Sequence, residues 1–100
     1  MLEIDSNLLN MLIVFYPEHN LDLKKLEKLK NVSEYNQCLI KELLDSWNWE
    51  LDNISMTRSK SYIKDIFPYE WLDFLQKRIK DVNRHVEFYN LFTLLNNLLN

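Results

Sequence analysis

The apolar residues in the last third of the chain, 67–100, recur at alternating steps of three and four. This spacing matches the repeat of an α-helix and excludes the two-residue alternation of a strand. One stripe consists of Leu72, Leu75, Ile79, Val82, Val86 and Tyr89, and a second of Phe88, Phe92, Leu95 and Leu99. Because the segment has no glycine and a single proline, Pro68, the pattern predicts a long helix that the rest of the chain covers.

The length of this segment bears on whether the helix is continuous. A helix of about thirty residues would extend roughly 45 Å, whereas a compact domain of about a hundred residues has a radius of gyration of about 13 Å. We therefore expect a kink or break between Asn83 and Asn90, with Asn90 capping a final short helix. The alternative is an unbroken helix that projects from the domain and forms a homodimer.

Two shorter helices are predicted in the first third of the chain. Asp5 or Ser6 can cap a first helix with Leu8, Leu9, Leu12 and Phe15 on its apolar face, and Pro17 ends it. Asn20 or Asp22 can cap a second helix. Its inward residues are Leu23, Leu26 and Leu29. Asn31 suits the end of this helix, because asparagine tolerates the left-handed conformation in a chain without glycine.

A third helix begins after Ser33, which is the best capping residue in the sequence. Its apolar positions form one stripe of Ile40, Leu44, Trp47 and Leu51, and a neighbouring one of Tyr35, Leu39 and Leu43. The polar stretch 52–59 predicts a loop. A short turn over 59–66 then precedes Pro68, which can start the last helix. The pattern as a whole predicts one all-α domain over 1–100, a small bundle or irregular array of four to five helices.

Charge and cysteine content narrow the classes of function. The formal net charge of −3 disfavours direct nucleic-acid binding, which needs a basic surface, and favours a basic protein partner. The single cysteine, Cys38, cannot form an internal disulfide and indicates a cytoplasmic protein. No apolar run is long enough to cross a membrane. Because the chain has no glycine-rich phosphate loop and no metal-ligand spacing, we expect no cofactor and no metal.

The segment 42–52 is the first candidate site. It combines two tryptophans with four carboxylates and contains no basic residue. Trp47 belongs to the apolar stripe, but Trp49 lies about 200° away around a helix, so we expect it to be partly exposed. An exposed tryptophan among carboxylates suits the centre of an interface with a basic partner. The predicted partner-binding residues are Glu42, Asp45, Trp49, Glu50 and Asp52. The alternative is that the helix ends early and Trp49 folds back onto the core.

The second candidate is the pair Arg78 and His85, two helical turns apart on one face. This spacing resembles the arginine, six residues, histidine signature of HEPN ribonucleases, which are helical bundles of about this size. The resemblance implies that the pair supplies an acid or base and a cation for the scissile phosphate, normally across a dimer. The sequence departs from that pattern at Ile79, where the family commonly has a polar residue. The alternative is a surface arginine and a histidine at the edge of the core.

These observations favour a small intracellular protein that binds and inhibits another protein, and is not an enzyme. Bacterial immunity proteins, which neutralise a toxin that is often a basic nuclease, are similar in size and charge. That similarity is one of style, without a shared motif. The alternatives are the HEPN-like ribonuclease with Arg78 and His85 as catalytic residues, and a phage counter-defence inhibitor.

Overall fold

The computed structural model describes residues 2–55 and 82–100, and the side chains of 50–55 and 82 are not among the features described. Within these ranges the fold is all-α, a small helical array without strands. The predicted turn over 59–66, Pro68, Arg78 and the upstream part of the long apolar stripe lie outside the described residues.

The first helix, α1, spans Ser6–Phe15 and is capped by Asp5, as the sequence predicts. The Asp5 carboxylate accepts a hydrogen bond from the backbone N–H of Leu8 at 2.9 Å and so satisfies one of the free donors at the helix start. A short 3-10 turn, η1, follows over Pro17–His19. The left-handed residue of this region is Asn20, with φ of 49°.

The second helix is shorter than predicted. The α-helix α2 covers Leu23–Leu26 with Asp22 as its cap, and the 3-10 helix η2 continues over Glu27–Asn31. Asn31 does end this element, but it is not left-handed, because the chain leaves η2 in an extended conformation at Val32. Leu26 and Leu29 are fully buried, whereas Leu23 is 44% exposed. The prediction for Leu23 is wrong because this residue opens the helix and faces outward.

The third helix, α3, spans Glu34–Ser55. Ser33 caps it, with its hydroxyl oxygen accepting a hydrogen bond from the Asn36 N–H at 3.2 Å. The helix therefore runs through Asp52–Ser55, where we expected a loop. Polar residues alone do not end a helix, because each costs only a fraction of a kcal/mol there. Tyr35, predicted to face inward, is exposed.

Gln37 holds the connection between η2 and α3. Its side-chain amide donates hydrogen bonds to the carbonyl oxygens of Lys30 and Val32, at 3.3 and 3.1 Å. Its Oε1 accepts a hydrogen bond from the Leu2 N–H at 3.4 Å. One side chain therefore ties the N-terminal segment and the turn at residues 30–32 to the start of α3.

The last helix, α6, spans Val82–Leu99 without interruption. The predicted break between Asn83 and Asn90 is therefore wrong, and Asn90 lies inside the helix. The described helix of eighteen residues extends about 27 Å, roughly the diameter of a small domain, so its length does not require a break within it. Its inward face is the predicted second stripe, with Leu91 added, whereas Val86 and Tyr89 of the first stripe are exposed.

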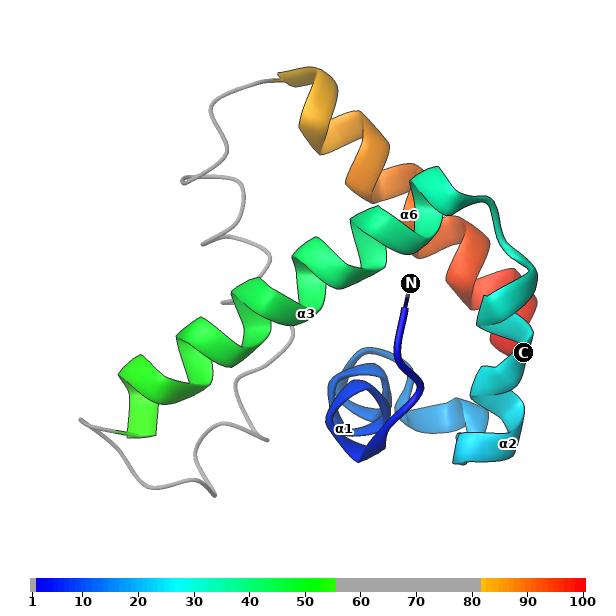
Figure 1. Ribbon diagram of the computed structural model, residues 1–100, viewed down its shortest axis with the longest axis horizontal. Helices are drawn as coiled ribbons and strands as arrows, with labels where there is room; N and C mark the ends of the chain where they lie inside the picture. The colour runs from blue at the N-terminus through cyan, green and yellow to red at the C-terminus, as the bar shows by residue number, and fades with distance from the viewer. Residues whose placement is uncertain (1, 56–81) are drawn as a thin grey trace.

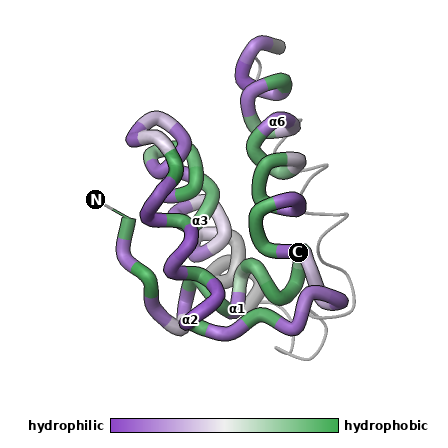
Figure 2. The backbone as a smooth tube through the Cα atoms, turned by 90° about the vertical axis from the view of Figure 1, so that its right-hand side faces the viewer, coloured by the Kyte–Doolittle hydropathy of each residue, from purple (hydrophilic) through white to green (hydrophobic). Residues whose placement is uncertain are grey.

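The core lies where these helices meet. Figure 1 shows α3 crossing the molecule, α1 seen nearly end on beside it, and the C-terminal end of α6 close to η2. In the turned view of Figure 2, α6 stands alongside α3 with α1 and α2 at one end. Among the described elements, α1, α2, η2, α3 and α6 all contribute core residues: Leu8, Met11, Leu12, Leu26, Leu29, Leu39, Ile40, Leu43, Trp47, Phe88, Leu91, Leu95 and Leu99. Phe15 joins three helices, with its ring 6.1 Å from that of Trp47 and 5.3 Å from that of Phe92.

Candidate functional site

The outward face of α3 carries the described part of the predicted binding site. Glu42, Asp45 and Trp49 follow one another at steps of three and four, so they share one side of the helix. All three are exposed, and the Trp49 side chain retains 46% of its accessible surface. Trp47 points the other way and is buried in the core. The prediction that one tryptophan is buried and its neighbour is partly exposed is confirmed.

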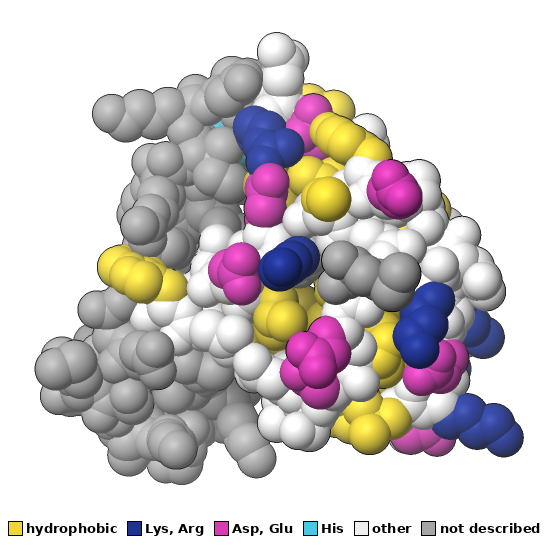
Figure 3. All heavy atoms as spheres, in the orientation of Figure 1, with side chains coloured by type: hydrophobic (Ala, Val, Ile, Leu, Met, Phe, Trp, Pro, Cys, Tyr) yellow, Lys and Arg dark blue, Asp and Glu magenta, His cyan; other side chains and the backbone are white. Residues whose placement is uncertain are grey.

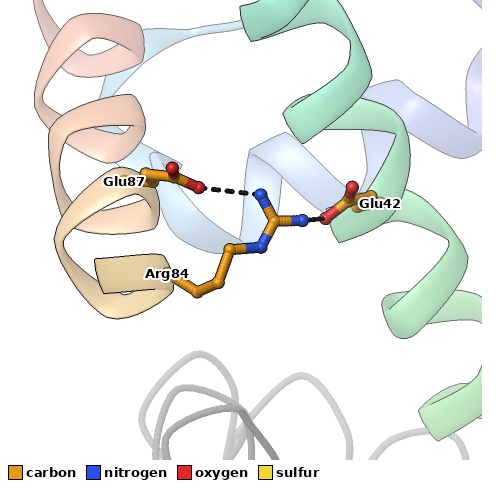
Figure 4. Close-up of polar contacts among 3 residues, drawn as sticks. All are labelled: Glu42, Arg84 and Glu87. Atoms are coloured by element: carbon orange, nitrogen blue, oxygen red, sulfur yellow. Dashed lines mark hydrogen bonds and ion pairs between the residues drawn. The ribbon is translucent and has the colours of Figure 1, made fainter. Parts of the chain in front are cut away.

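The carboxylate of Glu42 contacts another helix of the same chain, although its side chain is half exposed. It forms an ion pair and hydrogen bond with the Arg84 guanidinium, which reaches it from α6 (Figure 4). The other arm of Arg84 binds Glu87, one turn along α6, at 2.7 Å. One cation therefore links carboxylates on two helices that are distant in sequence. Glu42 helps to hold α3 against α6 and is not a free carboxylate on the surface.

Two aromatic residues complete this cluster. The Arg84 guanidinium lies over the ring of Phe88, 5.5 Å from its centre, where the ring face attracts a cation. Tyr35 of α3 lies near enough to the Glu87 carboxylate to affect the pKa of both groups. We call Tyr35, Glu42, Arg84, Glu87 and Phe88 the α3–α6 polar cluster.

The hydrogen bonds of the α3–α6 polar cluster shift the ionisation of its members. Those from Tyr35 and Arg84 lower the pKa of the Glu87 carboxyl, because they favour its charged form. The bond to Glu87 raises the pKa of Tyr35. Bonds to Glu87 and Glu42 raise the pKa of Arg84 above its already high value. Tyr35, Arg84 and Glu87 thus keep their ordinary charges at neutral pH, and the cluster works as a fixed electrostatic link.

Asp45 differs from Glu42 in having no hydrogen bond or ion pair with another residue of the described chain. It lies on the same side of α3 as Trp49, one helical turn before it. Among the described residues of the predicted site, Asp45 and Trp49 are therefore the pair that faces outward. In the orientation of Figure 1, Figure 3 shows acidic and basic side chains interspersed over the described part of the molecule, so the charge in this view is local to small groups and is not a continuous acidic patch.

The remaining predicted residues are only partly covered by the structure. The backbone of Glu50 and Asp52 belongs to α3, but their side chains lie outside the described features. His85 is half-buried on α6, and Arg78 lies outside the described residues. The structure therefore does not bring Arg78 and His85 together in a described site, and the ribonuclease alternative stays a prediction.

Residues 2–55 and 82–100 contain neither a cluster of metal ligands nor a membrane-spanning helix. In these ranges no group of three or more His, Cys, Asp and Glu side chains is placed to hold a metal ion. No helix there combines the length and apolar character needed to cross a bilayer.

Sequence reasoning missed Arg84 and Glu87 as structural residues. Their spacing of three on a helix is a signal for a local ion pair. The third member, Glu42, is 42 positions away from Arg84, so only the packing of α3 on α6 reveals it.

Comparison with protein-family models, with curated proteins and with solved structures gave no match. The functional argument therefore rests on the residues of this chain.

Proposed function

We propose that this protein binds a basic protein through the outward face of α3 and inhibits it, in the manner of an immunity protein that neutralises a toxin. The observation that carries the proposal is the exposure of Trp49, 46%, next to the carboxylate of Asp45. Large exposed aromatic residues are the commonest anchors of protein interfaces, and nearby charges guide the approach of an oppositely charged partner.

The site residues have distinct roles in this proposal. Trp49 fills an apolar pocket of the partner, and Asp45, with Glu50 and Asp52 from the same segment, faces its basic groups. If the partner is a nuclease, these carboxylates take the places of substrate phosphates. Glu42 contributes indirectly, since its contact with Arg84 holds α3 in position. We place the protein in the cytoplasm, in keeping with its single exposed thiol, Cys38.

The experiment is affinity capture from the native host, comparing the wild-type chain with Trp49→Ala. Wild type should retain a basic protein, and Trp49→Ala should weaken the complex by at least about 2 kcal/mol, roughly thirtyfold in Kd. Leu23→Ala is the matched control, because Leu23 is an exposed apolar residue on α2, away from α3. This variant should bind like wild type.

Function and folding are separated by two further measurements. Trp49→Ala should keep the circular dichroism spectrum of wild type and change the melting temperature far less than a core substitution does, since Trp49 is 46% exposed and is not among the buried core residues. Expressed alone the protein should not slow growth, and coexpression should relieve the toxicity of the captured partner. A Trp49→Ala chain that unfolds, or one that binds the partner at full strength, contradicts the assignment of Trp49. A captured partner identified as a phage-defence protein would select the counter-defence alternative.

The charge of Asp45, beside Trp49 in the proposed interface, provides a second test. Asp45→Lys should slow association with the basic partner and leave dissociation nearly unchanged, because long-range attraction acts mainly before contact. The effect should shrink as salt is added, since salt screens exposed charges. An unchanged association rate at low salt would count against a basic partner.

A further inference from the structure

The outward face of α6 carries apolar and neutral polar side chains but no charged ones. Val86 is 54% exposed and Tyr89 is 73% exposed, on the side of the helix opposite the buried Leu91 and Leu95. The exposed residues from this point to the end of the chain are Val86, Tyr89, Asn90, Thr93, Leu94, Asn96, Asn97 and Asn100. We call this set the neutral face of α6.

The absence of charge is unusual for this protein. Asp, Glu, Lys and Arg make up 27% of the chain, yet none of them, and no histidine, occurs from Phe88 to Asn100. The exposed face of α3 carries Glu34, Lys41 and Asp45 over a similar length. Depletion of charge together with exposed tyrosine is the composition found at the centres of protein interfaces. The neutral face therefore has the character of a contact surface, and it lies on a different helix from Trp49.

The charge distribution also indicates the occupant. A face without charge offers nothing to steer a strongly basic or acidic partner, so it favours a surface that is equally neutral. A second copy of the chain supplies such a surface. Because each chain carries a net charge of −3, two copies repel one another through their other faces, and contact through α6 brings them together with the least electrostatic cost.

The side chains on the neutral face can pair with the same side chains of a second copy. Asn90 and Asn97 each offer a donor and an acceptor, so two identical amide groups can hydrogen bond across a two-fold axis. The Thr93 hydroxyl donates to the Tyr89 carbonyl oxygen at 3.2 Å within the helix, which leaves its oxygen able to accept from a partner. Val86 and Tyr89 supply apolar area at one end. We infer that two copies of this protein associate through the neutral face of α6 in a weak, symmetric dimer.

The dimer is weak because the face is small. From Val86 to Asn97 the helix extends only about 17 Å, so a single pair of helices buries less surface than a stable interface of standard size, about 800 Å² on each partner. Association should therefore depend on concentration in the micromolar to millimolar range. It should also strengthen as salt is added, since salt screens the repulsion between two acidic chains and the interface contains no charges to be screened.

Sedimentation equilibrium of the full chain tests this inference directly. Wild type should shift from the mass of one chain toward that of two as concentration rises, and more so at high salt. Tyr89→Lys places a charge at the most exposed aromatic position and should weaken the dimer at least about tenfold. Leu23→Lys, an equal change of an exposed apolar residue on α2, should leave the dimer unchanged.

A second variant guards against a loss of fold. Asn97→Glu changes an exposed residue two turns further along α6 and should also weaken the dimer, with an unchanged melting temperature. Wild type that remains a single chain up to millimolar concentration overturns the inference. So does a dimer that survives both substitutions, or one that Leu23→Lys dissociates equally well. Because the test needs no toxin, its outcome is independent of the proposed inhibitory function.

Discussion

The helices α3 and α6 have nearly equivalent inward faces and very different outward faces. Each places four buried apolar side chains in the same core: Leu39, Ile40, Leu43 and Trp47 from α3, and Phe88, Leu91, Leu95 and Leu99 from α6. Outside, α3 carries Lys41 and the carboxylates that precede Trp49, whereas α6 carries no charged residue beyond Glu87. Core packing is therefore uninformative about function here. The outward faces suit two kinds of contact, one with a charged partner and one with a neutral partner.

Core substitutions on either helix test whether the two inward faces contribute equally to stability. Leu43→Ala on α3 and Leu95→Ala on α6 remove side chains that are 1% and 0% exposed. Each should lower the free energy of unfolding by about 2 to 5 kcal/mol through lost burial and the cavity that remains. Urea denaturation measures both. Leu23→Ala should change stability by no more than about 0.5 kcal/mol. A cost for Leu95→Ala as small as that of Leu23→Ala would mean that α6 is not part of the shared core.

The polar connection between the two helices should matter less. Arg84→Gln removes the ion pairs to Glu42 and Glu87 in the α3–α6 polar cluster. Because the Arg84 side chain is one-third exposed, water screens both pairs, and the free energy of unfolding should fall by about 1 kcal/mol or less. Lys41→Gln on α3 is the control, and thermal denaturation at low and high salt is the measurement. A loss that equals the leucine variants would show that the ion pairs dominate the packing of α6.

The smallest expected effect is the pH dependence of the α3–α6 polar cluster. The pKa of Glu87 is lower in the folded chain than its ordinary value of 4.5, first through Tyr35 and then through Arg84. Its contribution to stability is therefore present above pH 4.5 and is lost as the pH falls through the folded pKa. An NMR titration of Glu87 should show this lowered pKa, and Tyr35→Phe should raise it toward the ordinary value. An unchanged pKa of Glu87 in Tyr35→Phe would show that the Tyr35 hydroxyl is not the main cause of the lowered value.

Residues that act within one or two helical turns were predictable from the sequence. Asp5, Asp22 and Ser33 cap helices because a cap depends on backbone groups three residues away. The exposure of Trp49 also followed from local geometry, since helical rotation separates it from Trp47.

Features set by tertiary packing were not predictable in this way. Two apolar stripes compete for the inward face of α6, and periodicity alone does not say which one the core takes. The core took the stripe of Phe88, and Val86 and Tyr89 were left outside. Glu42 looked like a surface carboxylate for the same reason, because its partner on α6 becomes visible only once the two helices are packed.

The hydroxyl of the buried Tyr16, at the end of α1, donates a hydrogen bond to the backbone carbonyl oxygen of Phe92 at 2.9 Å. Turning α6 by one residue, about 100°, would carry this carbonyl away from Tyr16 and bring a different stripe inward. The bond at the C-cap of α1 thus supports the rotation that the buried stripe of α6 sets, and with it the side of the last helix that the protein presents to its surroundings.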